Sequence, residues 1–497
     1  MGTVHAKEPN NPSGLGQLSK ENASANKCND PPNDPAKDDF PSFSSSKSQL
    51  HREDENEQTN NILLQTVQAR VDKIHVDGLV RTKDDIIKSQ VMDLFKASNF
   101  EDVIIRAYKV RERLDALGCF RNIGIYIDTS HGSDATPDGV EVTFKVREMR
   151  RLVGGISTMV GNNEGSLLVG ARAPNLFGRA ERVQMEYSHG NKSSINFNVS
   201  AIKPFPQSLY NAVLTGTVFS TTHDFPWSGF KQNDKGLMFD IELNQTDTSK
   251  HNIQYEAAFR NINCSKQAAF RVREQCGPNL KSALRYIWTI DKRDSPIFPV
   301  SGSLMRLTTE MAGLGGDIGF LKNELAIQTN WSPHEYLTFQ LGLQSGLLSA
   351  ISNDMKISIA DHFFLGGPLN LRGFDMRGCG PRSEGNSVGG EMYWAAALHV
   401  YTPLPFRPGR NSFGDLFRLH GFINGGNLSN FTYGERSNLY NENMKIFTEN
   451  VRCAIGGGIA MRLGNIARIE LNLVTPLLFM RSDVLQQFQF GIGVQYL

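Results

Sequence analysis

The chain has 497 residues, of which 39% are hydrophobic, and its 52 lysines and arginines nearly balance 51 aspartates and glutamates. This balance gives no reason to expect nucleic acid as a partner. No apolar stretch approaches the ~18 residues that a transmembrane helix needs. The chain is therefore either soluble or crosses a membrane with β-strands, which place polar residues on the lumenal face of a barrel.

Residues 1–62 form a polar leader that is rich in Asn, Ser, Asp, Lys and Pro. Such a segment buries too little apolar surface to order itself, so we expect the leader to be disordered. It has neither the basic and apolar regions of a bacterial signal peptide nor the Arg-rich, acid-poor composition of a mitochondrial presequence.

A small α+β module is expected over residues 68–148. Ala69–Val76 alternates as a strand, and two helices follow it. The second helix, over about Glu101–Leu117, has its apolar residues at helical spacing. Strands over Arg121–Asp128 and Gly139–Arg147 complete the order β-α-α-β-β.

From Arg150 onward, apolar and polar residues alternate in runs of about ten, the length that a tilted strand needs to cross a bilayer. In Leu337–Gln344, for example, every second residue is Leu or Phe. The runs are centred near residues 155, 168, 185, 197, 214, 241, 256, 286, 306, 325, 341, 395, 421, 458, 471 and 492. We therefore expect an all-β transmembrane barrel of about 16 antiparallel strands over residues 149–497.

The connections between these strands are sorted by length. The longest, about 263–280, 348–388 and 427–450, follow the seventh, eleventh and thirteenth strands, and most even-numbered connections are short, with 402–415 as the exception. Membrane barrels place their long loops on the side opposite the termini. A soluble β-sandwich has no reason to sort its loops in this way, so the pattern favours a barrel.

The last strand has one apolar face and one small or polar face. Phe488, Phe490, Ile492, Val494 and Tyr496 alternate with Gln489, Gly491, Gly493 and Gln495. Gly491 and Gly493 weaken strand pairing here, and Gly154 and Gly155 do the same in the first strand. We expect this seam to open sideways and to expose unpaired backbone groups on which another strand can pair.

The longest loop contains Leu371-Arg372-Gly373-Phe374, which closely matches the (V/L/I)-R-G-F signature of the BamA-type outer-membrane assembly superfamily. Asp291–Gly302 is similar to the turn D-x-R-D-x-P of that family. Gln489–Tyr496 resembles the β-signal in the final strand of mitochondrial outer-membrane barrels, and the module at 68–148 resembles a POTRA domain. Within the superfamily, the chain is most similar to the core barrel subunits of the mitochondrial sorting and assembly machinery (SAM).

The resemblance implies the insertion and folding of β-barrel precursor proteins into the mitochondrial outer membrane, by β-signal capture at a lateral gate between the first and last strands. It implies four kinds of partner: unfolded β-barrel precursors, membrane lipid, metaxin-like SAM subunits on the cytosolic face, and inner-membrane organising proteins. The N-terminus and the POTRA domain would lie in the intermembrane space. The alternative is a protein-translocating or solute-conducting outer-membrane pore of the same superfamily.

A guanidinium is always charged and offers five donors, so Arg372 can enter a wide lumen and hold its loop against polar wall residues. The resemblance implies an acidic partner on a strand near the C-terminus, where this chain has Asn424. We expect Asn424 to accept a hydrogen bond from Arg372, and Glu391 is a second candidate partner.

The sequence contains no G-x-S-x-G, Walker or H-E-x-x-H motif and no spacing typical of metal ligands. We therefore expect no enzyme activity, no cofactor and no metal site. Cys264 and Cys276 share one predicted loop and are close enough to pair, but we expect isolated thiols.

Overall fold

The computed structural model describes residues 2–7, 67–132, 135–161, 164–191, 194–206, 210–352, 355–404, 413–430, 445, 448–464, 467–493 and 497. The chain divides into two compact units. The first comprises residues 1–79, 90–114 and 122–146, and the second comprises residues 80–89, 115–121 and 147–497.

The elements before the barrel form a mixed sheet and two helices. They are β1 (Gly2–Lys7), β2 (Arg70–Leu79), α1 (Asp84–Val91), the 3-10 helix η2 (Met92–Lys96), α2 (Phe100–Ala116), β3 (Phe120–Thr129) and β4 (Gly139–Glu148). The sheet order is β1-β2-β4-β3, with β2 parallel to β4. Val103, Ala107, Val110 and Leu114 of α2 are buried, as their helical spacing predicts. The predicted order β-α-α-β-β is therefore present, and the POTRA assignment stays a prediction.

The strand β1 corrects the prediction of a leader that is disordered from its first residue. Gly2–Lys7 pairs antiparallel with β2, from Lys73 to Leu79. Main-chain hydrogen bonds hold an added edge strand whatever its composition, so the polarity of the leader did not reveal this pairing. The prediction is wrong for these six residues, and residues 8–62 lie outside the described part of the chain.

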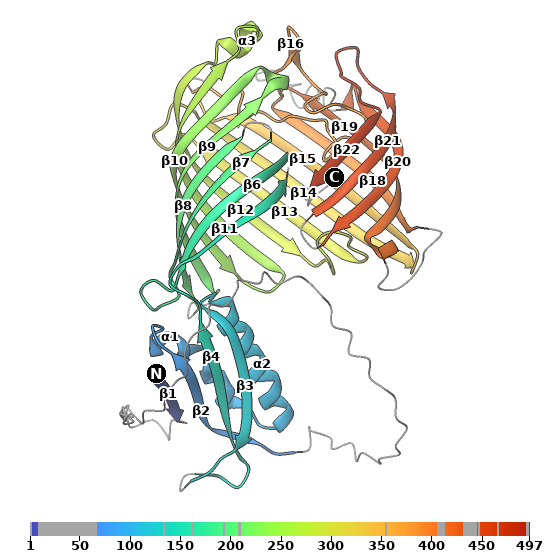
Figure 1. The fold of residues 1–497 in the computed structure, drawn as a ribbon. Coiled ribbons are helices and arrows are strands. Elements are labelled where there is room, and N and C mark those ends of the chain that lie inside the picture. The colour runs from blue at the N-terminus through green and yellow to red at the C-terminus, as the bar shows by residue number, and fades with distance from the viewer. Residues whose placement is uncertain are drawn as a thin grey trace, which may run out of the picture. The chain divides into compact units, whose positions relative to one another are not determined.

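The second unit contains an antiparallel sheet of 16 strands, as the alternating sequence predicted. Its strands are β5 (Val153–Gly161), β6 (Glu164–Pro174), β7 (Arg182–Gly190), β8 (Ile195–Phe205), β9 (Ala212–Phe225), β10 (Phe230–Asn244), β11 (Ser249–Cys264), β12 (Gly277–Asp291), β13 (Gly302–Ala312), β14 (Phe320–His334), β15 (Leu337–Ala350), β18 (Met392–Pro403), β19 (Phe417–Ser429), β20 (Arg452–Leu463), β21 (Ala467–Leu478) and β22 (Phe488–Gly493). Each strand pairs with the next along the chain, and the sheet curls around an interior (Figure 1).

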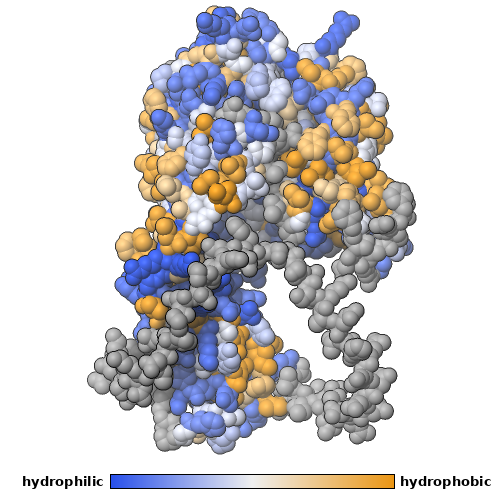
Figure 2. Space-filling model, viewed as in Figure 1, coloured by the Kyte–Doolittle hydropathy of each residue, from blue (hydrophilic) through white to orange (hydrophobic). Residues whose placement is uncertain are grey.

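Burial along the strands is the reverse of that in a soluble protein. In β15, Leu341 is 55% exposed, whereas its neighbour Gln340 on the opposite face is 2% exposed. Apolar residues gather over the outer face of the strands in Figure 2, and hydrophilic residues cover the end of the barrel that holds α3 (Phe270–Arg273). This distribution fits a wall that faces lipid outside and a polar interior inside. Among the described helices, none is both long and apolar enough to span a membrane.

The two ends of the sheet are β5 and β22, which are neighbours in space. Within the described residues, the sheet has no hydrogen-bonded ladder between them. Side chains along β5 are open to the surroundings, with Ile156 73% and Met159 49% exposed. In the part of the chain that the structure describes, the outer edge of β5 has no ladder partner, and such an edge presents backbone N–H and C=O groups to which another strand can pair.

The three long connections lie where the sequence predicted them. The first, 265–276, contains α3, and the second, 351–391, contains the two-residue strands β16 (Arg382–Ser383) and β17 (Asn386–Ser387). Both lie at the same end of the barrel in Figure 1. The third, 430–451, falls largely outside the described residues. Two short 3-10 helices, η3 (Pro226–Ser228) and η4 (Phe413–Leu416), occupy other connections.

Cys264 and Cys276 form a disulfide in the first of these loops, which corrects the prediction of isolated thiols. Their Cα atoms are 6.1 Å apart, within the range that a disulfide bridges. The turn of α3 brings the two ends of the loop together, and the absence of a C-x-x-C spacing did not anticipate this closure.

Candidate lumenal site

The long loop between β15 and β18 folds back into the barrel and fills it. Leu371 and Phe374 have no exposed surface, and they belong to an apolar core with Phe422, Ala454 and Val474 of the wall. The lumen at this level is therefore a packed interior.

Arg372 is fully buried in this interior and pairs with a carboxylate of the wall. Its Nε and Nη2 donate hydrogen bonds of 3.2 and 3.1 Å to Oε2 of Glu470 in β21. Arg468 contacts the other oxygen of Glu470 at 2.7 Å, and Asn472 donates to Oε2. The Phe422 ring lies 5.0 Å below the guanidinium. Two cations and an amide thus surround one buried carboxylate, and the cations balance its charge, as a charge in such a place requires.

The sequence analysis placed the partners of Arg372 only in part. Asn424 does contact Arg372, but it donates from Nδ2 to the backbone oxygen at 3.2 Å instead of accepting from the guanidinium. The counter-charge is Glu470. Glu391, the other candidate, lies just before β18, and eight residues of extended chain, about 26 Å, separate it from His399, which lies beside Arg372. Glu470 carried a signal that was overlooked, because it is a carboxylate between Ile469 and Leu471 in a membrane-spanning run.

Gly373 is required for two separate reasons. Its φ of +93° lies in the left-handed region, which other residues rarely adopt. A Cβ at this position would also lie 2.9 Å from Cβ of Ala454 and 3.0 Å from Cγ1 of Val474. Glycine therefore lets the backbone of the motif lie directly against β20 and β21.

Gln489 joins the last strand to the same motif. Its Oε1 accepts from the backbone N–H of Gly373 at 3.0 Å, and its Nε2 donates to the backbone oxygen of Phe374 at 2.7 Å. Gln489 is 1% exposed, so both bonds lie in the dry interior. The polar residue that resembles the start of a β-signal is therefore the main side-chain contact between β22 and the loop.

A second cluster of charges holds the loop to the other side of the wall. Asp361 of the loop accepts a 2.9 Å hydrogen bond from Arg260 of β11, and Lys281 of β12 lies 3.6 Å from its other oxygen. Lys281 also contacts Glu310 of β13 at 2.6 Å, and Lys322 of β14 donates to the backbone oxygen of Asp361. The loop is thus tied to β11–β14 as well as to β19–β22.

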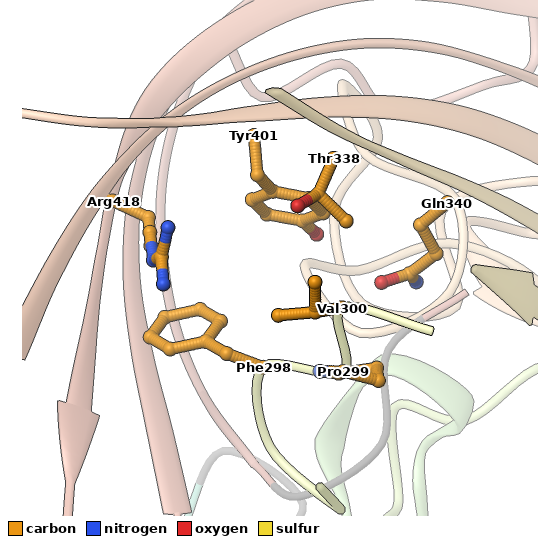
Figure 3. A pocket seen from close by; sticks show the side chains of 7 residues that line it. All are labelled: Phe298, Pro299, Val300, Thr338, Gln340, Tyr401 and Arg418. Atoms are coloured by element: carbon orange, nitrogen blue, oxygen red, sulfur yellow. The ribbon is translucent and has the colours of Figure 1, made fainter. Parts of the chain in front are cut away.

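The connection between β12 and β13 folds toward the interior and lines a small pocket. Figure 3 shows its lining residues, which are Phe298, Pro299, Val300, Thr338, Gln340, Tyr401 and Arg418. The cavity measures about 10 Å³, room for one water molecule. Such a pocket does not accommodate an organic substrate.

The glycines predicted for the seam lie in two different strands, β22 and β5. Gly491 and Gly493 pair with Glu470 and Arg468, so they share the lumenal face with the charges around Arg372. Gly154 and Gly155 lie in β5, paired with Ala171 and Gly170 of β6, and a Cβ at Gly155 would meet nothing within 4 Å. Val494 and Tyr496 lie outside the described residues.

The sequence of the barrel matches the model of a known protein family. The model described as the Omp85 superfamily domain matches residues 175–496, which cover most of the barrel. The chain belongs to the Omp85 superfamily. Among solved structures, BamA from Haemophilus ducreyi lacking POTRA domains 1–3 is similar, with a TM-score of 0.70 and 15% identity over 86% of this chain and 84% of that one.

Curated relatives place the Omp85 chain within a branch of the superfamily. It is 43% identical to a sorting and assembly machinery component 50 homolog from Bos taurus, over 88% of this chain and 92% of the relative. It is 34% identical to a SAM50-like protein from Drosophila melanogaster, over 87% of this chain and 96% of the relative. The chain is thus a SAM50-type Omp85 protein, as the sequence resemblance predicted.

Proposed function

We propose that this chain inserts and folds β-barrel precursor proteins into the mitochondrial outer membrane. The edge of β5 would receive the terminal β-signal of a precursor in place of the chain's own β22. SAM50-type proteins are non-enzymatic, and the proposed work is strand pairing.

The observation that carries this proposal is the edge of β5, which has no ladder partner among the described residues, beside a filled lumen. In hydrocarbon, each unsatisfied backbone N–H or C=O group of an inserting strand costs several kcal/mol. An exposed edge supplies these hydrogen bonds as the strand arrives, and it does so where lipid meets the wall. Precursor hairpins would accumulate at this edge until the new barrel closes and leaves.

The filled lumen argues against the alternative of a conducting pore. The loop is held to the wall by Arg372 on one side and by Asp361 on the other. Both ion pairs are buried and linked to further hydrogen bonds, so opening the lumen would leave charges unpaired. A passive pore would need neither anchor.

The surroundings of the barrel follow from the same proposal. The module at 68–148 would be a POTRA domain in the intermembrane space, together with the N-terminus. Metaxin-like subunits would bind on the cytosolic face, and inner-membrane organising proteins and membrane lipid would be the other neighbours. The curated relatives are named as components of a sorting and assembly machinery, which supports the proposal that this chain works within such a machinery.

Reconstitution tests the proposal. The full chain is inserted into liposomes that contain a trapped small dye, and an unfolded mitochondrial β-barrel with its β-signal is added. We expect the precursor to fold faster than in empty liposomes, measured by its altered gel mobility, while the dye stays inside. A precursor that folds no faster, together with free escape of the dye, would identify the chain as a pore.

A further inference from the structure

Leu497 lies inside the barrel, away from β22 and against strands farther along the sheet. It is 1% exposed and joins the apolar core that contains Leu371 and Phe374. A Cβ on Gly342 of β15 would lie 3.0 Å from the carbonyl carbon of Leu497 and 3.7 Å from its Cα. Since β21, β20, β19 and β18 separate β22 from β15 in the sheet, Leu497 has crossed part of the lumen.

Both main-chain polar groups of Leu497 have partners there. Its N–H donates to the backbone oxygen of Leu369 at 3.0 Å. Its carbonyl oxygen accepts from His399 Nε2 at 2.7 Å and from Arg372 Nη1 at 3.3 Å. His399 and Arg372 are both 0% exposed. Buried main-chain polar groups need such partners, so these contacts bind both the N–H and the oxygen of Leu497.

The geometry shows that His399 donates its hydrogen bond to Leu497. A carbonyl only accepts, so the 2.7 Å bond requires the hydrogen of the imidazole to be on Nε2. That nitrogen then cannot accept from Arg372 Nη1, although the two lie 3.4 Å apart. The other nitrogen, Nδ1, has no hydrogen-bond partner among the described residues. The one hydrogen that His399 can donate is therefore given to residue 497.

We propose that Arg372, His399 and the Leu369 carbonyl form a lumenal clamp that binds the main chain of Leu497 and its apolar side chain. The clamp holds Leu497 inside the barrel, away from the edge of β5. Its consequence for precursor insertion rests on the proposed function, because an end that is held inward does not compete for β5. The binding itself does not depend on that function.

A disulfide between introduced cysteines tests the binding. The substitutions Gly342→Cys and Leu497→Cys keep the main chain that the clamp binds, and a Cβ on residue 342 would lie 3.7 Å from Cα of residue 497, so the two side chains start side by side. The full chain is oxidised in membranes, and the linked peptides are quantified by mass spectrometry. We expect a strong link with His399 present. In His399→Phe the yield should fall about tenfold, because the ring stays and the donor is lost.

Two further variants separate clamping from general damage to the core. His420 stacks beside His399 at 6.0 Å but bonds to Asn472, so His420→Phe should leave the link intact. His399→Gln, which restores an N–H donor, should recover much of the yield. A link that forms equally well in His399→Phe, or one lost equally in His420→Phe, would overturn the clamp.

Precursor folding then tests the consequence separately. With the clamp broken in His399→Phe, the freed end would compete for β5, and precursor folding in liposomes should slow about threefold or more, an effect of roughly one lost hydrogen bond. An unchanged folding rate alongside a lost link would leave the clamp standing and refute its role at the seam. If the unaltered chain does not speed folding at all, the proposed function fails while the linking result still decides the clamp.

Discussion

The side-chain amide of Gln489 donates a 2.7 Å hydrogen bond to the backbone oxygen of Phe374. One residue belongs to the last strand and the other to the loop that fills the lumen. The same amide accepts from Gly373, so two bonds join these elements in a dry interior. A shift of β22 therefore strains or breaks the hydrogen bonds to Gly373 and Phe374, and the same bonds hold β22 in place.

Replacing Gln489 with Leu should release the loop from β22. The change leaves the Gly373 N–H and the Phe374 carbonyl buried without partners, at a cost of about 1–3 kcal/mol each. We expect faster hydrogen exchange over the loop and a lower denaturant midpoint in lipid vesicles. Phe490→Leu, on the lipid-facing side of the same strand, is the control and should leave the exchange of the loop unchanged. Equal exchange in both variants would contradict the coupling.

Replacing Arg372 alone should destabilise the fold more, per residue changed, than replacing Arg372 and Glu470 together. Arg372→Met leaves Glu470 buried with one cation fewer, and we expect a loss of about 3 kcal/mol in unfolding free energy. Adding Glu470→Gln removes the stranded charge. The double variant should therefore lose less than the sum of the single losses, with a coupling of about 1–3 kcal/mol in a double-mutant cycle. Strict additivity would show that the two side chains do not interact.

The two requirements on Gly373 can be separated with a second glycine of the same loop. Gly385 also has a positive φ, of +87°, but a Cβ there would meet nothing within 4 Å. Gly385→Ala should cost only the backbone strain, about 1–2 kcal/mol. Gly373→Ala adds a clash with Ala454 and Val474, worth about 1–3 kcal/mol more. Chemical unfolding of both variants checks this order, which a similar loss in each would contradict.

The turn after β2 should loosen in acid. Burial raises the pKa of Glu148, but hydrogen bonds from Thr82, Val80 and Arg81 outweigh burial and hold the pKa below its ordinary value. A carboxyl with a depressed pKa stabilises the fold above its unfolded pKa, near 4.3, and this stabilisation is lost as the pH falls through the folded value.

We therefore expect the amides of residues 80–82 to be protected from hydrogen exchange at pH 7 and to lose protection below about pH 4, after correction for intrinsic rates. Glu148→Gln should weaken this protection at pH 7 and flatten its dependence on pH. Protection in the unaltered chain that stays constant down to pH 3 would refute the assignment.

Local patterns were enough to predict the strands. In Leu337–Gln344 the period of two is set by the backbone alone, so the sequence revealed both the strand and the face that meets lipid. The same holds for the helical spacing of Val103, Ala107, Val110 and Leu114. These features depend on neighbours a few residues apart, and the structure confirms them.

Contacts between distant residues were harder to predict. Arg372 and Glu470 are 98 residues apart, and their meeting depends on how the loop folds into the lumen. The motif predicted Arg372 as a lumenal anchor, but the candidate partners were Asn424 and Glu391, and Glu470 was not among them. Likewise, Gln489 was predicted to belong to a β-signal, while its bond to the loop required the register of β22 against β21. The disulfide of Cys264 depends on the turn of α3 in the same way.

Locking the seam tests the central claim most directly. Single cysteines are placed along β5, from Gly154 to Met159, and along β22, from Phe488 to Ile492, until a pair is found that forms a disulfide in membranes. Precursor folding is then measured in liposomes with the seam oxidised and again after reduction. We predict that the oxidised chain no longer speeds folding and that reduction restores it. Equal acceleration in both states would show that precursors do not enter between β5 and β22.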